Sequence, residues 1–482
     1  MSVQHAPLTR RRLLKFGGLT GATLGAAGLS NLLLAPGAAH AADYKALVCV
    51  FLYGGNDGLN TIVPSDTARY AQYSGVRQAL ALPRASLVNL AGSDYGLHPS
   101  LAALAPVWAD GKLAPVFNVG PLYAPLTKAA LRAAAGNSAL VPDNLFSHSD
   151  QQILWETGST DSLTRTGWGG RAADTLATVN PVISVGGNGR FGLSALNAPL
   201  VLPESGATFG AYELAGEPYQ LNYAPLVARA SALRAIYQQT QDSELAEVYA
   251  RMQRDAFAVS ERLGALVKTQ PGTNTASMAV IDAAFAGLTS NGTVAAGLPR
   301  QLYQAAKLIA GNATVLGNRQ LFFAQQGGFD THGNQVAASD VTQGEHARLL
   351  KAVGDALAAF YTAMKNLGMG DVVTTFTQSD FGRTFKPNNS GGTDHAWGNQ
   401  HLVIGGAVRG GTTYGRYPEL ALGGPDDVGV DAWELQGRWI PTTSVDQYAA
   451  TLLGWFGASE AQLDAVLPNL VNFGANRRLG FL

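Results

Sequence analysis

The chain has 482 residues, of which 46% are hydrophobic and 14% charged, with 33 basic side chains, 34 acidic side chains and a single cysteine, Cys49. This composition is that of a globular protein, without internal repeats or long charge blocks. The net charge of −1 provides no basic field for nucleic acid. One cysteine excludes an intrachain disulfide.

The first 41 residues have the features of an export signal. Thr9-Arg10-Arg11-Arg12-Leu13-Leu14-Lys15 matches the twin-arginine pattern, and a Gly/Ala-rich stretch follows it. Ala39-His40-Ala41 supplies small residues for cleavage before Ala42. We therefore expect a signal peptide over residues 1–41 rather than a stable transmembrane anchor. The twin-arginine translocation machinery would export the chain already folded, to the periplasm or the medium.

Residues 42–482 are expected to form one α/β domain. Six short apolar runs flanked by glycine are typical of strands buried on both faces of a parallel sheet. These runs are Leu47–Tyr53, Leu113–Val119, Val182–Val185, Leu321–Ala324, Val372–Thr377 and Leu402–Ile404. Helical patterns lie between them, and the clearest, His346–Leu367, predicts a βαβ crossover. Residues 222–309 are mostly helical in pattern, with the best segments at Arg229–Gln239 and Ser243–Lys268, and predict an insertion that packs on the sheet or forms a cap.

Acidic and histidine side chains follow three of the predicted strands. The first strand leads to Asp57, the run Leu321–Ala324 leads to Asp330 and His332, and Val372–Thr377 leads to Asp380. Ligands of an open α/β sheet bind in the crevice at the carboxyl ends of its strands. Oxygen and imidazole groups that meet there are suited to a divalent metal, such as Zn, Mn, Mg or Ca. The expected metal ligands are Asp57, Asp330, His332, Asp380, Asp394 and His395.

Two further groups near these strands have alternative interpretations. Arg383 either clamps an anionic group of a substrate or forms an ion pair with a nearby acid. Ser147, with His148 beside it, precedes a predicted helix, Gln151–Thr157, and is either a helix cap or a nucleophile whose developing charge gains from the helix dipole. We take Ser147, His148 and Arg383 as candidate catalytic residues.

Several common motifs are missing or incomplete. There is no G-x-S-x-G elbow, which argues against an ordinary serine α/β-hydrolase. Gly187–Gly192 spells G-x-G-x-x-G, but Pro199 soon follows where a helix is required, so the pattern does not indicate dinucleotide binding.

The chain resembles the DUF1501 family of exported bacterial proteins over nearly all of its mature length. The matching stretches are Phe51-Leu52-Tyr53-Gly54-Gly55-Asn56-Asp57-Gly58, Gly96-Leu97-His98-Pro99, Ser147-His148, Gly328-Phe329-Asp330-Thr331-His332, Ser379-Asp380-Phe381-Gly382-Arg383, Thr393-Asp394-His395 and Ile440-Pro441-Thr442-Thr443-Ser444. That family is similar to the alkaline phosphatase/sulfatase superfamily. The resemblance implies a three-layer α/β sandwich with a mostly parallel central sheet and a helical insertion.

The superfamily resemblance also implies roles for single residues. Asp57 would be the acid after the first strand, Ser147 the nucleophile, Asp330 and His332 the middle pair, Asp380 the acid of an S-D-H-G turn, and His395 the last histidine. The chain departs from this pattern at Phe381, which stands where the turn has a ligand histidine, and in the single residue between Asp330 and His332 in place of three. These departures leave open one metal, an altered two-metal geometry, or no metal.

The resulting functional expectation is an exported metal-dependent hydrolase or transferase that acts on a phosphate or sulfate ester. The alternative is a non-catalytic cell-envelope protein that keeps the fold with a degenerate metal site and binds a small anionic ligand or a glycan. A cofactor-carrying redox protein is a third interpretation, suggested by the export route alone.

Overall fold

A computed structural model describes residues 43–134, 139–207, 209, 223–273 and 275–482. Its centre is an eight-stranded sheet in the order β13-β5-β12-β11-β1-β10-β6-β7. The strands are β1 (Lys45–Leu52), β5 (Leu113–Gly120), β6 (Ile183–Ser184), β7 (Leu200–Val201), β10 (Arg319–Gln326), β11 (Val373–Ser379), β12 (Asn399–Gly405) and β13 (Thr443–Ser444). All six strands predicted from the sequence are confirmed. The expected signal peptide lies outside the described residues.

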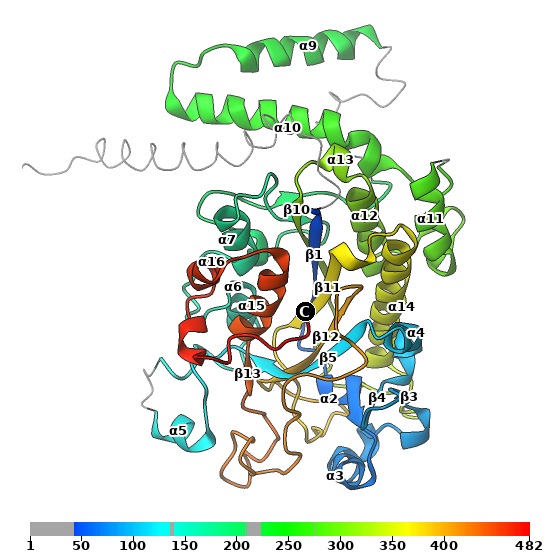
Figure 1. The fold of residues 1–482 in the computed structure, drawn as a ribbon, viewed down its shortest axis with the longest axis vertical. Helices are drawn as coiled ribbons and strands as arrows, with labels where there is room; N and C mark the ends of the chain where they lie inside the picture. The colour runs from blue at the N-terminus through cyan, green and yellow to red at the C-terminus, as the bar shows by residue number, and fades with distance from the viewer. Residues whose placement is uncertain (1–42, 135–138, 208, 210–222, 274) are drawn as a thin grey trace, which may run out of the picture.

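The sheet is mostly parallel. β1 lies between β10 and β11 and is parallel to both, while β6 continues the parallel order beyond β10. β12 is the exception, because it runs antiparallel to its neighbours β11 and β5. The predicted helix at His346–Leu367 is α14 (Glu345–Asn366), and it connects the parallel strands β10 and β11 as expected. The carboxyl ends of β1, β10 and β11 therefore meet at one edge of the sheet (Figure 1).

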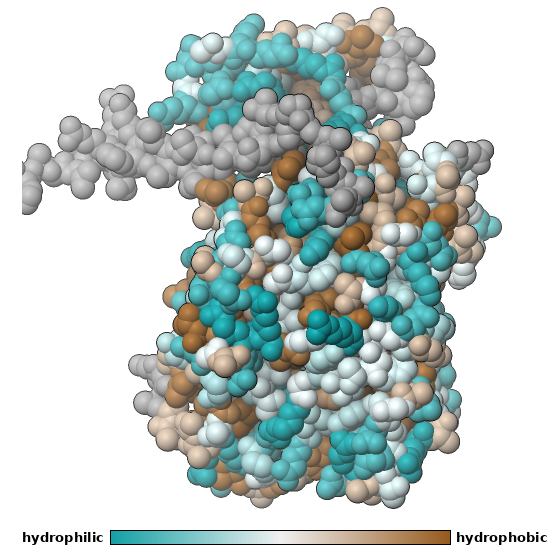
Figure 2. Space-filling view, in the orientation of Figure 1, coloured by the Kyte–Doolittle hydropathy of each residue, from teal (hydrophilic) through white to brown (hydrophobic). Residues whose placement is uncertain are grey.

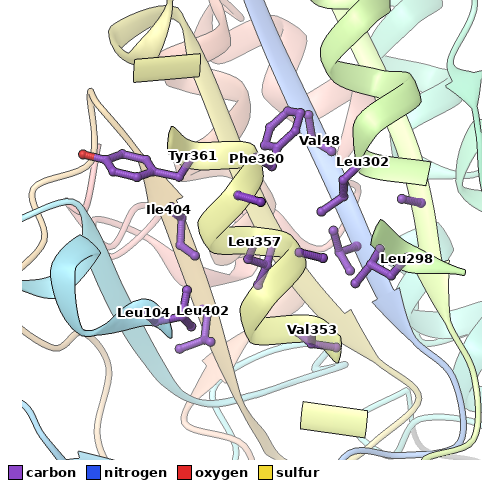
Figure 3. Close-up of a cluster of buried hydrophobic side chains, with 14 of the residues drawn as sticks. Val48, Leu104, Leu298, Leu302, Val353, Leu357, Phe360, Tyr361, Leu402 and Ile404 are labelled. Atoms are coloured by element: carbon purple, nitrogen blue, oxygen red, sulfur yellow. The ribbon is translucent and has the colours of Figure 1, made fainter. Parts of the chain in front are cut away.

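Helices cover both faces of the sheet, so the fold has the three layers that the resemblance implies. Side chains of β1 alternate between two apolar clusters, since successive strand residues point to opposite faces. Val48 packs with Leu302 of α12 (Leu298–Ala310) and Leu357 of α14 (Figure 3). On the other face, Cys49 belongs to a cluster with α7 (Trp168–Thr175), α15 (Val445–Phe456) and α16 (Glu460–Val466). Cys49 is thus a packing residue of the core.

The segment expected as a helical insertion contains α9 (Ala224–Gln238), α10 (Glu244–Lys268), α11 (Ala276–Ala284) and α12, with a short β8–β9 hairpin (Thr289–Ser290, Thr293–Val294). α12 is buried and belongs to the helical layer on the sheet. α9 and α10 form a projecting pair whose surface is mostly hydrophilic (Figures 1 and 2). α10 packs on α13 (Asn312–Val315), which leads into the amino end of β10. The pair is therefore at the edge of the sheet opposite to the carboxyl ends.

The remaining elements surround the sheet. β2 (Ile62–Pro64), β4 (Tyr95–Leu97) and β3 (Val88–Asn89) form a small antiparallel sheet next to α2 (Gly58–Thr61), α3 (Thr67–Arg77) and α4 (Ala105–Ala109). α5 (Lys128–Ala133) and α6 (His148–Thr157) follow β5. None of the helices in the described ranges has both the length and the apolar character needed to span a bilayer.

Candidate metal centre

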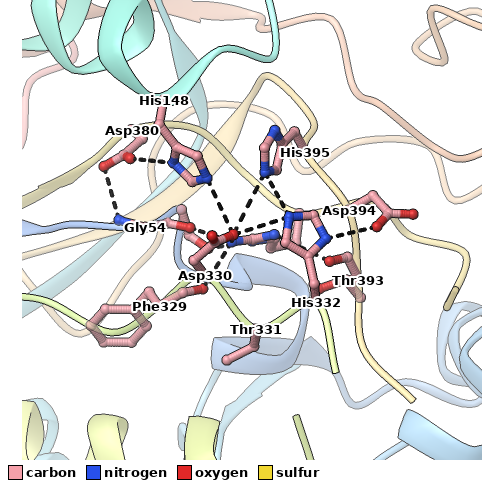
Figure 4. A network of polar contacts seen from close by, with 12 residues as sticks. Gly54, His148, Phe329, Asp330, Thr331, His332, Asp380, Thr393, Asp394 and His395 are labelled. Atoms are coloured by element: carbon pink, nitrogen blue, oxygen red, sulfur yellow. Dashed lines mark hydrogen bonds and ion pairs between the residues drawn. The ribbon is translucent and has the colours of Figure 1, made fainter. Parts of the chain in front are cut away.

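Three histidines and one aspartate meet where β1, β10 and β11 end. Asp330 and His332 follow β10, His148 is the first residue of α6, and His395 lies in the loop before β12. One ligand atom from each of the four lies within 4.8 Å of the others (Figure 4). The turn after β1 allows this close approach, because Gly54 has a φ of +110° and a Cβ there would be 2.4 Å from the Asp330 nitrogen.

The imidazole Nε2 atoms all face one carboxylate oxygen. Asp330 Oδ1 is 3.2 Å from His148 Nε2, 3.1 Å from His332 Nε2 and 3.6 Å from His395 Nε2. His332 Nε2 and His395 Nε2 are 2.8 Å apart. His148 Nε2 is buried and its contact with Asp330 does not have hydrogen-bond geometry.

The other nitrogen of each ring is held by an acceptor. His148 Nδ1 is 2.7 Å from Asp380 Oδ2, His332 Nδ1 is 2.8 Å from Asp394 Oδ1, and His395 Nδ1 is 2.6 Å from the Phe146 carbonyl oxygen. These acceptors carry no proton when the acids are ionised, so each Nδ1 donates. A neutral ring then presents the lone pair of Nε2 to the cluster. Lone pairs of His332 and His395 that face each other at 2.8 Å repel unless a cation or a proton lies between them.

This arrangement fits a metal ion. Metal-binding histidines generally donate their second N–H to a carboxylate or a carbonyl, which fixes the ring and the tautomer. Donors at about 2.0–2.1 Å from a tetrahedral ion are roughly 3.3 Å apart. The three contacts of Asp330 and the contact between His332 and His395 measure 2.8 to 3.6 Å, and all four ligand atoms lie within 4.8 Å of one another. His148, Asp330, His332 and His395 are the residues that would hold the ion.

Arg383 lies beneath this cluster and is buried. Its Nη2 donates to Asp330 Oδ1 at 2.6 Å and to the Phe329 carbonyl at 3.1 Å, and also to the Gly54 carbonyl. Nε donates to the Gly55 carbonyl at 2.8 Å and Nη1 to the Thr393 carbonyl at 3.1 Å. All three guanidinium nitrogens thus donate to oxygens of the protein itself. Of the two interpretations of Arg383, this geometry agrees with the ion pair to a nearby acid, which is Asp330. The guanidinium ties the turns after β1 and β10 together.

The charges around the cluster favour an ionised Asp330. Burial alone would raise the pKa of this carboxyl, but the hydrogen bond and charge of Arg383 lower the pKa below its ordinary value. The hydrogen bond to Asp380 raises the pKa of His148 against the opposing effect of burial. Burial lowers the pKa of His395, which keeps that ring neutral. The cluster therefore combines one ionised carboxylate with a neutral His395 ring, and a metal ion would compete with a proton for His148 Nε2.

Asp380 and Asp394 lie behind the histidines rather than in the cluster. Asp380 is fully buried and also accepts from Gly54 N and Gln152 Nε2, at 3.1 and 2.9 Å. Asp394 also accepts from Asn388 Nδ2 at 2.9 Å. Both carboxylates were expected to be metal ligands. In the structure each of them instead contacts the Nδ1 atom of a cluster histidine and so orients that ring.

Asp57, also an expected ligand, lies outside the cluster. Its two oxygens accept from Arg77 Nη1 and Nη2, each at 2.7 Å, and Oδ2 accepts from Gln335 Nε2 at 2.6 Å. Asp57 also caps α2 by accepting from Asn60 N. A carboxylate with all of these partners has no free oxygen for an ion, so we correct this assignment.

Ser147 is next to the cluster. It stands at the N-cap position of α6 but makes no capping hydrogen bond, and its hydroxyl donates to Asp150 Oδ2 at 2.6 Å. The residue before it, Phe146, accepts from His395, and the residue after it is His148. Ser147 thus lies in the sequence directly between Phe146, whose carbonyl holds His395, and His148 of the cluster.

Phe381 occupies the space behind two of the rings. Its ring centroid is 4.8 Å from that of His148 and 4.7 Å from that of His395. The sequence identified Phe381 as a departure from a histidine-containing turn, and the side chain is apolar packing for the two imidazoles.

Some groups of this site were not found from the sequence. Gln152 lies four residues after His148 on α6, so helical spacing could have placed it beside the same carboxylate. Asn388 and the Phe146 carbonyl leave no such signal, since loop conformation brings them to Asp394 and His395. His148, expected to be catalytic, is one of the four residues of the cluster.

Comparison with solved structures gives weak similarity. Crystal structures of Ps i-CgsB, in complex with k-i-k-neocarrahexaose and without it, align with 89% of this chain and 77% of theirs. The identities are 11% and 12%, with TM-scores of 0.32 and 0.33 respectively. At these values the similarity says nothing of function.

No curated protein matches the sequence. A family model described as "Protein of unknown function (DUF1501)" matches residues 44–430, which include all four residues of the cluster. The chain therefore belongs to the DUF1501 family.

Proposed function

We propose that this protein is an exported metal-dependent hydrolase, or transferase, that acts on a phosphate or sulfate ester. The observation that carries the proposal is the convergence of three Nε2 atoms on Asp330 Oδ1, each ring being fixed through Nδ1. Three imidazoles and one carboxylate favour Zn or Mn over Mg or Ca, because the last two prefer oxygen ligands. A bound divalent ion would polarise the ester and neutralise negative charge that develops on its oxygens.

Ser147 is the proposed nucleophile. Its hydroxyl already donates to Asp150, which can take the proton as Oγ bonds to phosphorus or sulfur and the ester bond to the alcohol breaks. The alcohol oxygen takes a proton from a water molecule as it leaves. The resulting hydroxide attacks phosphorus or sulfur and releases the phosphate or sulfate, while the serine oxygen takes its proton back from Asp150. The amino end of α6 favours the negative charge that develops on Oγ.

A cavity beside the site offers space for the organic part of the ester. It has a volume of about 390 Å³ and is lined by Ser149, Gln152, Asn188 and Arg190, among others. Gln152 also donates to Asp380 and so connects the cavity to the His148 side of the cluster. Amide and guanidinium groups of this kind suit a hydroxyl-rich alcohol, including a glycan.

The burial of Arg383 favours a second candidate, a metal-dependent binding protein without catalysis. All three nitrogens of Arg383 donate to protein oxygens, so this arginine does not contact a substrate anion. A metal-bearing protein that turns over no ester would support this alternative.

Elemental analysis of the chain purified without chelator tests the metal site. We expect about one divalent ion per chain in the wild type and loss of that ion in His332→Ala, because His332 contributes a ligand nitrogen. Asp340→Asn, which removes an exposed acid away from the cluster, is the matched control and should keep the ion. Wild-type protein that neither retains nor rebinds Zn²⁺ or Mn²⁺ would refute the proposal.

The reaction is tested with the same preparations and a panel of generic phosphate monoesters, phosphate diesters and sulfate esters. Hydrolysis that requires the metal and falls at least 100-fold in Ser147→Ala would support catalysis by Ser147. Metal binding without turnover of any ester would favour the binding protein.

A further inference from the structure

A second arginine, Arg438, lies at the same site with a different environment. Its Nε donates to the His395 carbonyl at 3.0 Å, and its guanidinium carbon is 4.8 Å from the centroid of the Phe146 ring. The backbone of Arg438 is also fixed, since its N–H donates to Asp427 Oδ1 at 3.1 Å and its carbonyl accepts from Val428 N at 3.0 Å. Within the part of the chain that the structure describes, the guanidinium is thus positioned without a carboxylate partner.

Phe146 connects Arg438 to the reacting groups. The Phe146 carbonyl accepts from His395 Nδ1 at 2.6 Å, and Ser147 is the next residue. Phe146 has a φ of 72°, in the left-handed region that bulky residues rarely adopt. This conformation holds the ring under Arg438 and the carbonyl on His395. Phe146 therefore contacts both a cation and a cluster histidine, and the candidate nucleophile is the residue that follows it.

The guanidinium of Arg438 has hydrogen-bond donors that are available to a ligand. Of its five guanidinium N–H groups, the one on Nε is used by the His395 carbonyl, which leaves those on Nη1 and Nη2. Among the described residues, no acidic side chain forms an ion pair with it, whereas the guanidinium of Arg383 is ion-paired with Asp330 and buried. A guanidinium that stacks on an aromatic ring and keeps its Nη groups free is suited to two oxygens of one tetrahedral anion.

We propose that Arg438 binds the charged oxygens of the substrate's phosphate or sulfate group, in the role expected of Arg383. This inference rests on the proposed function, because it assigns the anion-recognition residue of that site. It also limits the substrate to esters with at least one charged oxygen that is not in the scissile bond. Arg438 is thus an anion-binding residue, while Arg383 is structural.

Titration of the Zn²⁺-loaded chain with inorganic phosphate and, separately, inorganic sulfate tests the inference by calorimetry. We expect Arg438→Gln to weaken binding of the preferred anion roughly 10- to 100-fold, which is the loss of one charge-assisted bidentate contact. Arg438→Lys should retain part of the affinity, since lysine keeps the charge without the fork. Arg409→Gln, at an exposed arginine elsewhere, should change nothing.

The Zn²⁺ affinity of each variant separates this inference from the proposed function. Unchanged Zn²⁺ binding with weakened anion binding in Arg438→Gln supports the role of Arg438. Equal anion affinity in the wild type and Arg438→Gln, or no anion binding to the Zn²⁺-loaded wild type, overturns it while the metal site stands. If the wild type binds no metal, the proposed function fails, and the role of Arg438 is then decided by anion titration of the metal-free chain. Weaker anion binding in Arg438→Gln than in the wild type still supports that role. Any other result overturns the inference about Arg438.

Discussion

Two neighbouring parallel strands, β1 and β10, each lead to an aspartate, and the two acids have opposite surroundings. Asp57 is 0% exposed and shares both oxygens with Arg77. The Asp330 side chain is 49% exposed, and one of its oxygens faces three imidazole nitrogens. The charge of Asp57 is neutralised within the protein by an arginine of α3. At Asp330, lone pairs of the imidazoles converge, which is the arrangement that could hold a metal ion.

The difference explains why position after a strand does not by itself identify a ligand. Both acids follow β-strands at the same edge of the sheet, and both belong to motifs that the sequence singles out. Both acids have an arginine partner, and the deciding feature is its geometry. Arg77, 20 residues further on at the end of α3, contacts both oxygens of Asp57, whereas Arg383 donates to Oδ1 of Asp330. Asp57 thus stabilises the fold, and Asp330 is available for chemistry.

The strongest test of this contrast is Asp57→Asn. The substitution leaves Arg77 buried without a counter-charge, and we expect the free energy of unfolding to fall by about 3–5 kcal/mol. Denaturant unfolding in the presence of a chelator measures this loss independently of any metal. The folded fraction of the variant should still bind one metal ion per chain. Loss of the ion from folded Asp57→Asn would place Asp57 in the metal site and break the comparison.

A smaller effect is expected behind the cluster. Asp394→Asn removes the charge that orients His332 but leaves the four ligand residues in place. Outer-sphere substitutions of this kind typically lower metal affinity about 10- to 100-fold, and competition with a chromophoric chelator measures the change. Stability without metal should vary little, because Asp394 is partly exposed. An unchanged metal affinity would show that Asp394 does not support His332.

The fold was largely predictable from the sequence because its signals are local. Buried parallel strands such as β1 and β11 are continuous apolar runs, and α14 has a regular apolar stripe. β7 and β13 have two residues each and are too short to leave such a pattern. The packing of α12 on the sheet also depends on its neighbours, so the sequence assigned α12 to the insertion.

The site was only partly predictable, since its residues come from distant segments. The sequence identified His148, Asp330, His332 and His395, but it did not separate groups that face the cluster from groups behind it. Asp380 and Asp394 lie in the same kind of motif as the residues of the cluster. They are told apart only by the orientation of the histidine rings, whose Nδ1 atoms face these two carboxylates while the Nε2 atoms face the cluster. Arg438 has no motif signal, because its position depends on the left-handed conformation of Phe146 and on the His395 carbonyl. These are properties of loop geometry.

The smallest expected effect concerns protons in the Asp57 region. His346 donates through Nε2 to Asn56 Oδ1 at 3.0 Å, and burial, opposed by the charge of Asp57 and assisted by that of Arg77, lowers its pKa to about 4. The unfolded chain binds a proton near pH 6.5 while the folded chain does not, so stability is lost as pH falls from about 6.5 toward 4. His98 beside it behaves similarly, since burial lowers its pKa to about 3.

His346→Gln should therefore flatten the dependence of stability on pH. Between pH 7 and pH 5.5, the wild type is expected to lose about 1 kcal/mol through His346 alone, and the variant should not lose this amount. Urea unfolding at both pH values, with chelator present, measures the difference. His401→Gln offers a matched comparison, because burial lowers the pKa of His401 to about 3 at a position outside the Asp57 region. If His401→Gln flattens the dependence of stability on pH and His346→Gln does not, His346 is protonated in the folded chain as well. The region around Asp57 would then accommodate a second positive charge in addition to that of Arg77.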